Sequence, residues 1–211
     1  MRAQEEGERP GPGEQYNAGE PVRPRQAATV ILLRGGAEKL ELLLVRRTPA
    51  ARFMGGVWVF PGGAVDAEEG AGDSAHRAAA IRELSEEASI ELEDAGALVK
   101  FSRWITPAEV QIRFDTHFFL ATLPEGQVAE VDGEECVDLG WFTPAGALEA
   151  YRAKEIELVF PTIKHLEQLR EFSSVQELLE HASGREVLPV QPRVVLEGEV
   201  ARILLPGDPG Y

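Results

Sequence analysis

Three glutamates lie close together in a segment that otherwise has the pattern of an ordinary buried helix, residues 82–90, RELSEEASI. Glu83, Glu86 and Glu87 are three and four positions apart, so on a helix they share one face. Like charges at this spacing repel one another and lower helix stability unless a cation neutralises them. Carboxylate oxygens are the ligands that a hard divalent ion such as Mg²⁺ prefers, and such an ion can also hold phosphate oxygens. The pattern therefore favours a metal site over a solvated acidic face, which is the alternative.

The helix that carries the glutamates is predicted to start at Asp73 or Ser74, either of which can cap it, and to end at Ala88. On a helical wheel at about 100° per residue, Ile81, Leu84 and Ala88 fall on one side. The glutamates fall nearly opposite. We expect the helix to pack by its apolar side and to present the carboxylates from the other.

A second motif, FPGG at residues 60–63, precedes the acidic segment. Together, FPGG and RELSEEASI resemble the signature of the Nudix hydrolases, GX5EX7REUXEEXGU, in which U is aliphatic. The resemblance implies a mixed sheet between helices and the cleavage, with Mg²⁺ or Mn²⁺, of a nucleoside diphosphate linked to another group. By position, it implies that the metal-binding and catalytic residues are Glu83, Glu86 and Glu87. It also implies that the structural residues of the motif are Gly62, whose carbonyl can be a further ligand, Gly63 and Arg82.

The spacing inside the motif departs from the family pattern. Eighteen residues separate Gly63 from Arg82, whereas the signature has thirteen. Counting from either end of the insertion puts the isolated glutamate of the signature at Glu69 or at Ser74, so this position stays open. Arg82 is expected to orient the loop by pairing with an upstream acid, and the candidates are Glu68, Glu69 and Asp73.

The end of the motif also differs, because Ser89 stands where the signature has glycine. This position closes the helix, where glycine is favoured since it tolerates a positive φ. Serine adds modest backbone strain there but removes no catalytic group, so we expect activity to survive.

The segment LLVRRTPAARFMGGVWVFPGG, residues 43–63, resembles a second element, LLTXR(S/A)X3RX3GX3FPGG, found in coenzyme A diphosphatases. Val45 and Thr48 depart from it. The insertion, WFTPAGAL and FPTIKHLEQL add a likeness to the peroxisomal branch of these enzymes and its bacterial relatives, over residues 27–172. The implied substrate-binding residues are Arg47 and Arg52, whose planar guanidinium groups suit phosphate oxygens. Without the resemblance, they would be solvated loop charges.

The resemblance implies hydrolysis of the diphosphate of coenzyme A or acyl-coenzyme A to 3′,5′-ADP and 4′-phosphopantetheine, acylated or free. The candidates for the group that accepts the proton of the attacking water are Glu83, Glu134 and Glu135. Phe53 and Met54 could contact the pantetheine or acyl chain. One alternative is a Nudix pyrophosphohydrolase for a dinucleotide, sugar nucleotide or nucleoside triphosphate, and another is a non-catalytic ligand-binding regulator.

Composition narrows the remaining possibilities. The net charge of −15 disfavours nonspecific nucleic-acid binding. Cys136 is the single cysteine, which excludes an internal disulfide and a cysteine-based zinc site. No apolar run approaches the roughly 20 residues that cross a bilayer, so we expect no membrane association and a cytoplasmic location. The family resemblance adds a homodimer as the expected assembly.

The chain is predicted to form an α+β fold, because strands follow strands before helices return. Residues 1–26 are expected to be a flexible tail, 27–172 the Nudix domain, and 173–211 a helix and extended arm packed on the domain or on a partner subunit. Strands are predicted at residues 27–34, 41–47, 57–60, 97–105, 116–123 and 136–142. Helices after the acidic one are predicted at residues 144–154, 162–172 and 174–182, and a small hairpin or extended arm ends the chain.

Overall fold

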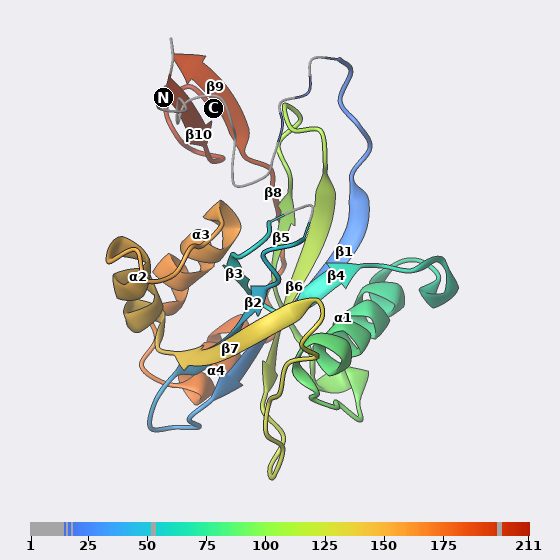
Figure 1. Cartoon of the computed structure of the whole chain (residues 1–211), viewed down its shortest axis with the longest axis vertical. Coiled ribbons are helices and arrows are strands. Elements are labelled where there is room, and N and C mark those ends of the chain that lie inside the picture. Colours follow the sequence, from blue (N-terminus) through green and yellow to red (C-terminus); the bar gives the residue numbers. More distant parts are fainter. Residues whose placement is uncertain (1–14, 16, 18, 52–53, 198–199) are drawn as a thin grey trace.

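A mixed sheet forms the middle layer of the protein and helices cover both of its faces (Figure 1). The computed structural model describes residues 15, 17, 19–51, 54–197 and 200–211. Helix α1 (Asp73–Ala88) packs on one face of the sheet. Helices α2 (Pro144–Arg152), α3 (Phe160–Leu169) and α4 (Val175–Ala182) pack on the other. The predicted α+β class, with a mixed sheet between helices, is confirmed.

The main sheet has eight strands built around a central parallel pair. Its strand order is β3 (Trp58–Val59), β2 (Glu41–Arg47), β1 (Arg25–Arg34), β6 (Phe114–Thr122), β5 (Val99–Ile105) and β8 (Pro189–Val190). Two further strands lie off this path: β4 (Gly62–Ala64) pairs with β1, and β7 (Cys136–Phe142) pairs with β2. Strands β1 and β6 run parallel from Arg25 opposite Phe114 to Leu33 opposite Thr122. The final strands, β9 (Arg193–Glu197) and β10 (Val200–Leu204), form a separate antiparallel hairpin.

Strand β1 is the centre of the sheet because its apolar side chains are buried on both faces. Successive residues of a strand point to opposite faces. Ile31 and Leu33 therefore join the core beneath α2, α3 and α4, whereas Val30 and Leu32 join the core beneath α1. All four are fully buried. The unbroken apolar run is what a strand covered on both faces requires.

Several predicted boundaries need correction. Strand β1 starts at Arg25, so the segment predicted to be a tail contributes its last two residues to the sheet. Helix α1 is preceded by Gly72 as the capping residue, and neither Asp73 nor Ser74 has that role. Helix α3 begins at Phe160 because Pro161 fits the first turn of a helix, where its missing N–H is not needed. Most of the tail, residues 1–14, 16 and 18, lies outside the described residues.

The hairpin predicted near the C-terminus is present as β9 and β10. Cys136 is a buried free thiol. No helix within the described part of the chain is long and apolar enough to span a membrane.

His165 of α3 is a titratable group at the centre of the core beneath α2, α3 and α4. Its side chain is 1% exposed, and its Nε2 lies 2.5 Å from the hydroxyl of Ser102. The ring centroids of Phe118 and Trp104 lie 4.3 and 5.6 Å from that of His165. Burial lowers the pKa of His165 to about 4. The imidazole is therefore neutral near pH 7 and packs as a partly apolar ring.

Replacing His165 with Gln should flatten the acid side of the stability curve. The pKa of His165 is about 4 in the folded protein and about 6.5 when unfolded, so between these values the unfolded chain binds the extra proton. The free energy of unfolding should therefore fall from pH 6.5 to pH 4, by about 3 kcal/mol from this group. Urea unfolding at pH 7.5 and 4.5 measures the loss, which should be smaller in His165→Gln than in wild type. An exposed control, His181→Gln, should behave as wild type; equal losses in His165→Gln and wild type would contradict the prediction.

Candidate functional site

The site begins where strand β4 passes close to both β1 and α1. In the β4–β1 pair, Gly62 lies opposite Thr29 and Gly63 lies opposite Ala28. A side chain at Gly62 would lie 2.5 Å from the carbonyl oxygen of Ala28, which is backbone. A side chain at Gly63 would overlap the carboxylate of Glu83. Glycine at these positions therefore lets one strand touch the sheet and the acidic helix at once.

Glu87 is the most deeply buried carboxylate of the site. It is 2% exposed, and its Oε2 accepts a hydrogen bond from the backbone N–H of Gly62 at 2.9 Å. Its Oε1 lies 3.6 Å from Nη1 of Arg47. Burial raises the pKa of Glu87 to about 7, although the Gly62 N–H and Arg47 both oppose the rise, and nearby Glu83 adds to it. The expectation that all three glutamates face away from the packed side of the helix is wrong for Glu87.

Glu83 and Glu86 are joined by one guanidinium group. Nη1 of Arg82 donates to Oε1 of Glu83 at 2.8 Å and to Oε2 of Glu86 at 2.9 Å. Glu86 is exposed, whereas Glu83 is only 13% exposed. Burial raises the pKa of Glu83 even though the hydrogen bond from Arg82 lowers it. The repulsion expected between these carboxylates is thus offset by an arginine of their own helix.

Arg82 also has an upstream acidic partner, which the sequence left open among three candidates. Its Nε donates to Oε1 of Glu69 at 3.0 Å, and its Nη2 donates to the carbonyl of Ala64 at 2.9 Å. Asp66 is a more distant acid, 3.6 Å from Nη2, whereas Asp73 instead pairs with Arg77 and Lys100. Glu69 is the residue found by counting forward from Gly63, so the five additional residues lie between Glu69 and Arg82.

The helix ends as the motif suggested. Ser89 has φ 54° and ψ 33°, which is the left-handed conformation, and its N–H donates to carbonyls of the last turn. A non-glycine residue is strained there by order of 1 kcal/mol. Since Ser89 follows the acidic residues and contributes no group to the carboxylate cluster, the strain leaves the cluster in place.

Two of the three carboxylates, those of Glu83 and Glu87, line a cavity of about 440 Å³, whereas Glu86 is not among its lining residues. Glu83, Glu87 and Arg47 line it, together with Glu135 from the start of the β7 region. Glu134, the other loop candidate, is not among the lining residues. Nε of Arg47 is buried and has no hydrogen-bond partner among the described residues, so it is a donor available to an anion. Arg52 and Phe53 lie outside the described residues, so the positions predicted for them stay predictions.

Met54 also lines the cavity, from the loop that follows β2. Its φ is 53°, a left-handed conformation that a residue with a side chain rarely adopts. The prediction that Met54 could contact a substrate is compatible with this position. Sequence reasoning missed the rest of the apolar lining, which comes from segments far apart in the chain.

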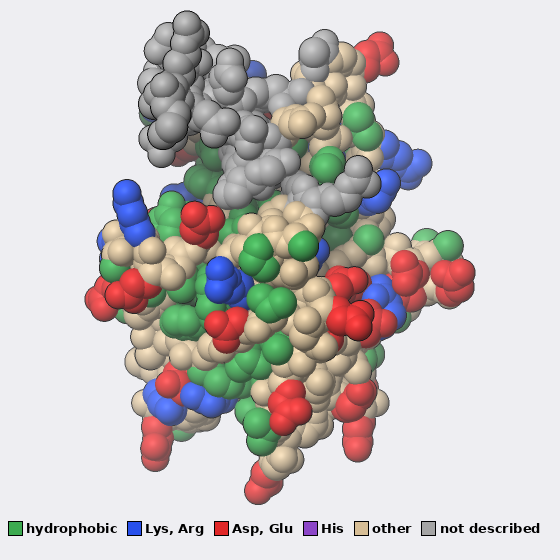
Figure 2. Space-filling model, viewed as in Figure 1, with side chains coloured by type: hydrophobic (Ala, Val, Ile, Leu, Met, Phe, Trp, Pro, Cys, Tyr) green, Lys and Arg blue, Asp and Glu red, His purple; other side chains and the backbone are tan. Residues whose placement is uncertain are grey.

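The donor set suits a hard divalent cation, although the side chains are not arranged as a finished metal site. Within the described part of the chain, no three Asp, Glu, His or Cys side chains form a group that could hold an ion as they stand. Two observations are nonetheless consistent with the binding of a divalent cation here. Glu83 and Glu87 are neighbouring carboxylates with raised pKa values in a largely desolvated place. A cation there would offset the cost of burying their charge. Figure 2 shows further acidic groups gathered over α1 and the segment before it.

Comparison with known proteins defines the class of this fold and site. The NUDIX domain model matches residues 23–162. The human acyl-coenzyme A diphosphatase NUDT19 is 34% identical over 123 residues, which are 56% of this chain and 33% of that protein. The matched region thus spans about a third of this relative.

Solved structures give the same fold. A Nudix hydrolase from Alicyclobacillus acidocaldarius has a TM-score of 0.69 and 25% identity, with 75% of this chain and 96% of that chain covered. The NUDIX domain of Shewanella oneidensis NrtR, in complex with ADP ribose, has a TM-score of 0.54 and 19% identity, with 71% and 88% covered.

A mixed sheet, a Gly-Gly strand and a helix bearing RELSEEASI together define a Nudix hydrolase domain. The chain belongs to the Nudix family, whose model matches well over half of it. The predicted family is confirmed, as is the similarity to acyl-coenzyme A diphosphatases. The comparisons also support the predicted enzyme class, a Nudix pyrophosphohydrolase.

Alanine at the two glycines of β4 should have different effects, lowering mainly stability at Gly62 and mainly activity at Gly63. In Gly62→Ala the new methyl group meets backbone of β1, so we expect a loss of about 1–3 kcal/mol in the free energy of unfolding. In Gly63→Ala it meets the end of the flexible Glu83 side chain, so the fold should persist while Glu83 is displaced. Urea unfolding should show that Gly63→Ala is more stable than Gly62→Ala. Assays of diphosphate hydrolysis should show that Gly63→Ala is the less active of the two. A Gly63→Ala protein with wild-type activity would contradict this assignment.

Proposed function

We propose that this chain is a metal-dependent diphosphatase that cleaves coenzyme A or acyl-coenzyme A to 3′,5′-ADP and 4′-phosphopantetheine, acylated or free. The observation that carries the proposal is that Glu83, Glu87 and Arg47 line one cavity, with Arg47 beside Glu87. The similarity to the human acyl-coenzyme A diphosphatase supports the choice of substrate.

The metal in this proposal is Mg²⁺ or Mn²⁺, held by Glu83, Glu86 and Glu87. When bound, such an ion neutralises charge on the diphosphate and supplies a site for a water nucleophile. Glu87 would keep its Gly62 hydrogen bond and be fixed in orientation by it. Arg82, held by Glu69 and by the Ala64 carbonyl, would remain as the positioning residue of the cluster.

Arg47 would contact the diphosphate. Its side chain is 25% exposed and lies beside Glu87, and its Nε has no hydrogen-bond partner among the described residues. Phosphate oxygens accept hydrogen bonds from such a group strongly because both partners are charged. Arg52 is proposed as a second phosphate contact on the motif alone.

Water would attack one phosphorus in line with the leaving oxygen, and its proton needs an acceptor. Glu83 and Glu135 are the candidates, because both line the cavity. Glu134 is a weaker candidate since it is not among the lining residues. Burial raises the pKa of Glu83, which makes this carboxylate a stronger proton acceptor than an ordinary glutamate.

A panel of diphosphates in the presence of Mg²⁺, read by product identity, tests the substrate. We expect 3′,5′-ADP from coenzyme A and acyl-coenzyme A, and slower turnover of ADP-ribose, diadenosine polyphosphates and nucleoside triphosphates. Glu87→Gln should lower kcat by about 100-fold or more while substrate binding is kept, because a carboxylate proposed to hold the catalytic cation is lost. Glu125→Gln, an exposed acid in a loop, is the matched control and should match wild type. Preferred turnover of another diphosphate would replace the proposed substrate, and an inert wild type that still binds nucleotides would favour a regulator.

Metal affinity should depend on pH through Glu87. Its pKa is raised to about 7 by burial, so the metal-free protein carries a proton there at pH 6 and has mostly lost it at pH 8. Because the ion binds the carboxylate, the proton competes with it, and affinity should rise by about tenfold from pH 6 to pH 8. Mn²⁺ titration by calorimetry or electron paramagnetic resonance at the two pH values measures the change. The same titration with Glu87→Gln should be weaker and less dependent on pH than that of wild type, and a pH-independent wild type would refute the assignment.

A further inference from the structure

Beyond the carboxylates, the cavity continues into a region lined by apolar side chains, which we call the apolar compartment. It is defined by six lining residues, Trp104, Ile105, Phe114, Phe160, Val194 and Ile203. They come from β5, β6, the first turn of α3 and the C-terminal hairpin. The rings of Trp104 and Phe160 meet edge to face, with centroids 6.2 Å apart. None of the six carries a charge or a hydrogen-bond acceptor on its side chain.

The C-terminal hairpin forms one wall of this compartment. Strand β8 pairs with β5, with Val190 opposite Trp104, and so brings the chain to the cavity before the hairpin starts. The backbone N–H of Val194 donates to Glu109 at 3.4 Å, and the hydroxyl of Tyr211 donates to the carbonyl of Gln191 at 2.8 Å. A two-stranded hairpin is only marginally stable by itself, so these anchors and the apolar packing hold it.

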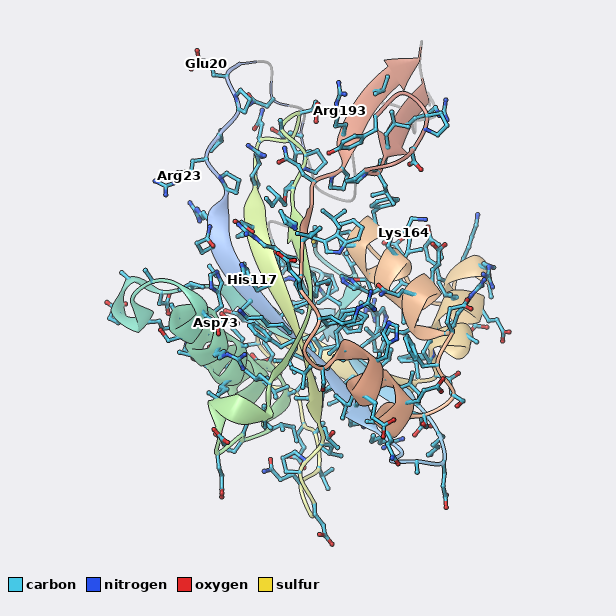
Figure 3. All side chains as sticks on the ribbon, turned by 180° about the vertical axis from the view of Figure 1, so that it is seen from behind. Glu20, Arg23, Asp73, His117, Lys164 and Arg193 are labelled. Atoms are coloured by element: carbon cyan, nitrogen blue, oxygen red, sulfur yellow. The ribbon has the colours of Figure 1, made fainter. Side chains whose placement is uncertain are left out.

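The C-terminal hairpin, β9 and β10, lies past the end of the main sheet that is near β8 (Figure 1). Seen from behind in Figure 3, Arg193 marks its start, and Lys164 lies on α3. Both elements contribute lining residues to the cavity, Val194 and Ile203 from the hairpin and Phe160 from α3. Val194 is 9% exposed, so it already packs as an interior side chain.

The lining decides which end of a coenzyme A thioester fits this compartment. The 3′,5′-ADP half carries a further phosphate, whose burial among apolar groups would cost several kcal/mol without a paired cation. Among the positively charged lining residues, Arg25 is the nearest to this region in the sheet, because it lies opposite Phe114 in the β1–β6 strand pair. Its side chain is exposed, so it stands at the rim and leaves the compartment interior without a charge. An alkyl chain needs no polar partner, and its binding is favoured by the removal of its methylene groups from water.

We propose, as an extension of the proposed function, that the apolar compartment holds the acyl chain of acyl-coenzyme A, and that Val194 and Ile203 determine the preference for acylated substrates. The diphosphate lies at Glu83, Glu87 and Arg47, and the pantetheine arm leads from it toward the compartment. The C-terminal hairpin is then part of the substrate site, and acyl length is limited by the wall it forms.

The test compares kcat/KM for coenzyme A, acetyl-coenzyme A and decanoyl-coenzyme A in the full-length protein with Mg²⁺. In wild type, we expect decanoyl-coenzyme A to exceed coenzyme A by about tenfold or more. Val194→Asp and Ile203→Asp each place a charge in the compartment and should reduce this ratio by about tenfold. Val128→Asp is the matched control, because Val128 is 74% exposed and not among the cavity-lining residues, and its ratio should equal that of wild type. Thermal unfolding identifies any variant that fails to fold, and the second hairpin variant then carries the comparison.

Each outcome decides one of the two proposals. If coenzyme A is cleaved but the ratio is the same in wild type and both hairpin variants, the acyl compartment is refuted and the proposed function stands. An equal loss for acylated and free coenzyme A would also refute it, because the compartment would then hold a part that both substrates share. If wild type cleaves neither, the proposed function is refuted. In that case, calorimetric binding of decanoyl-coenzyme A and coenzyme A tests the compartment: tighter binding of the acylated form that both hairpin variants lose would support it, and equal binding would overturn it.

Discussion

The site depends on holding a carboxylate, Glu87, almost out of contact with water. The free-energy cost of burying a charge without partners exceeds the stability of a small domain. The usual outcome is therefore a shifted pKa or a paired ion. Here the compensation is incomplete: one backbone N–H, from Gly62, and one guanidinium 3.6 Å away. The pKa of Glu87 accordingly remains raised to about 7 by burial. The charge of Glu87 is therefore only partly compensated by its neighbours. A cation can complete the compensation, and a diphosphate can bind with it because the two ligands neutralise one another.

Arg82 keeps the other two carboxylates in place without any ion. Its guanidinium donates to Glu83 and Glu86 on its own helix, and to Glu69 and the Ala64 carbonyl before the helix. These contacts fix the segment that leads into α1. Only residues 70–72 separate Glu69 from the start of α1 at Asp73, so at least two of the five additional residues belong to the helix.

The sequence predicted most elements because their patterns are local. Strands β2 and β7 were predicted with their observed bounds, and the acidic helix ends at Ala88 as expected. The burial of Glu87 was missed, because a helical wheel describes one helix and contains no information on a strand such as β4 beside it. The partner of Arg82 stayed open for a related reason, since several acids lie within reach along the sequence and only the fold selects Glu69. The apolar compartment was missed because Val194 and Ile203 lie about a hundred residues or more after the motif and are brought to it by tertiary contacts such as the β8–β5 pair.

The place of the cavity follows from side-chain size along a single strand. On the face of β1 beneath α2, α3 and α4, alternate residues are Ile31 and Leu33 at one end, which fill the core. At the other end they are Ala27 and Thr29, which line the cavity. Small side chains on a sheet leave space that must be filled or remain open, because interiors are otherwise close-packed. The same strand thus contributes large side chains to the core and, two residues earlier, small side chains that border the cavity. Strand β4 pairs with β1 at these small residues, and its glycines contact Glu83 and Glu87, so the open space adjoins these carboxylates of α1.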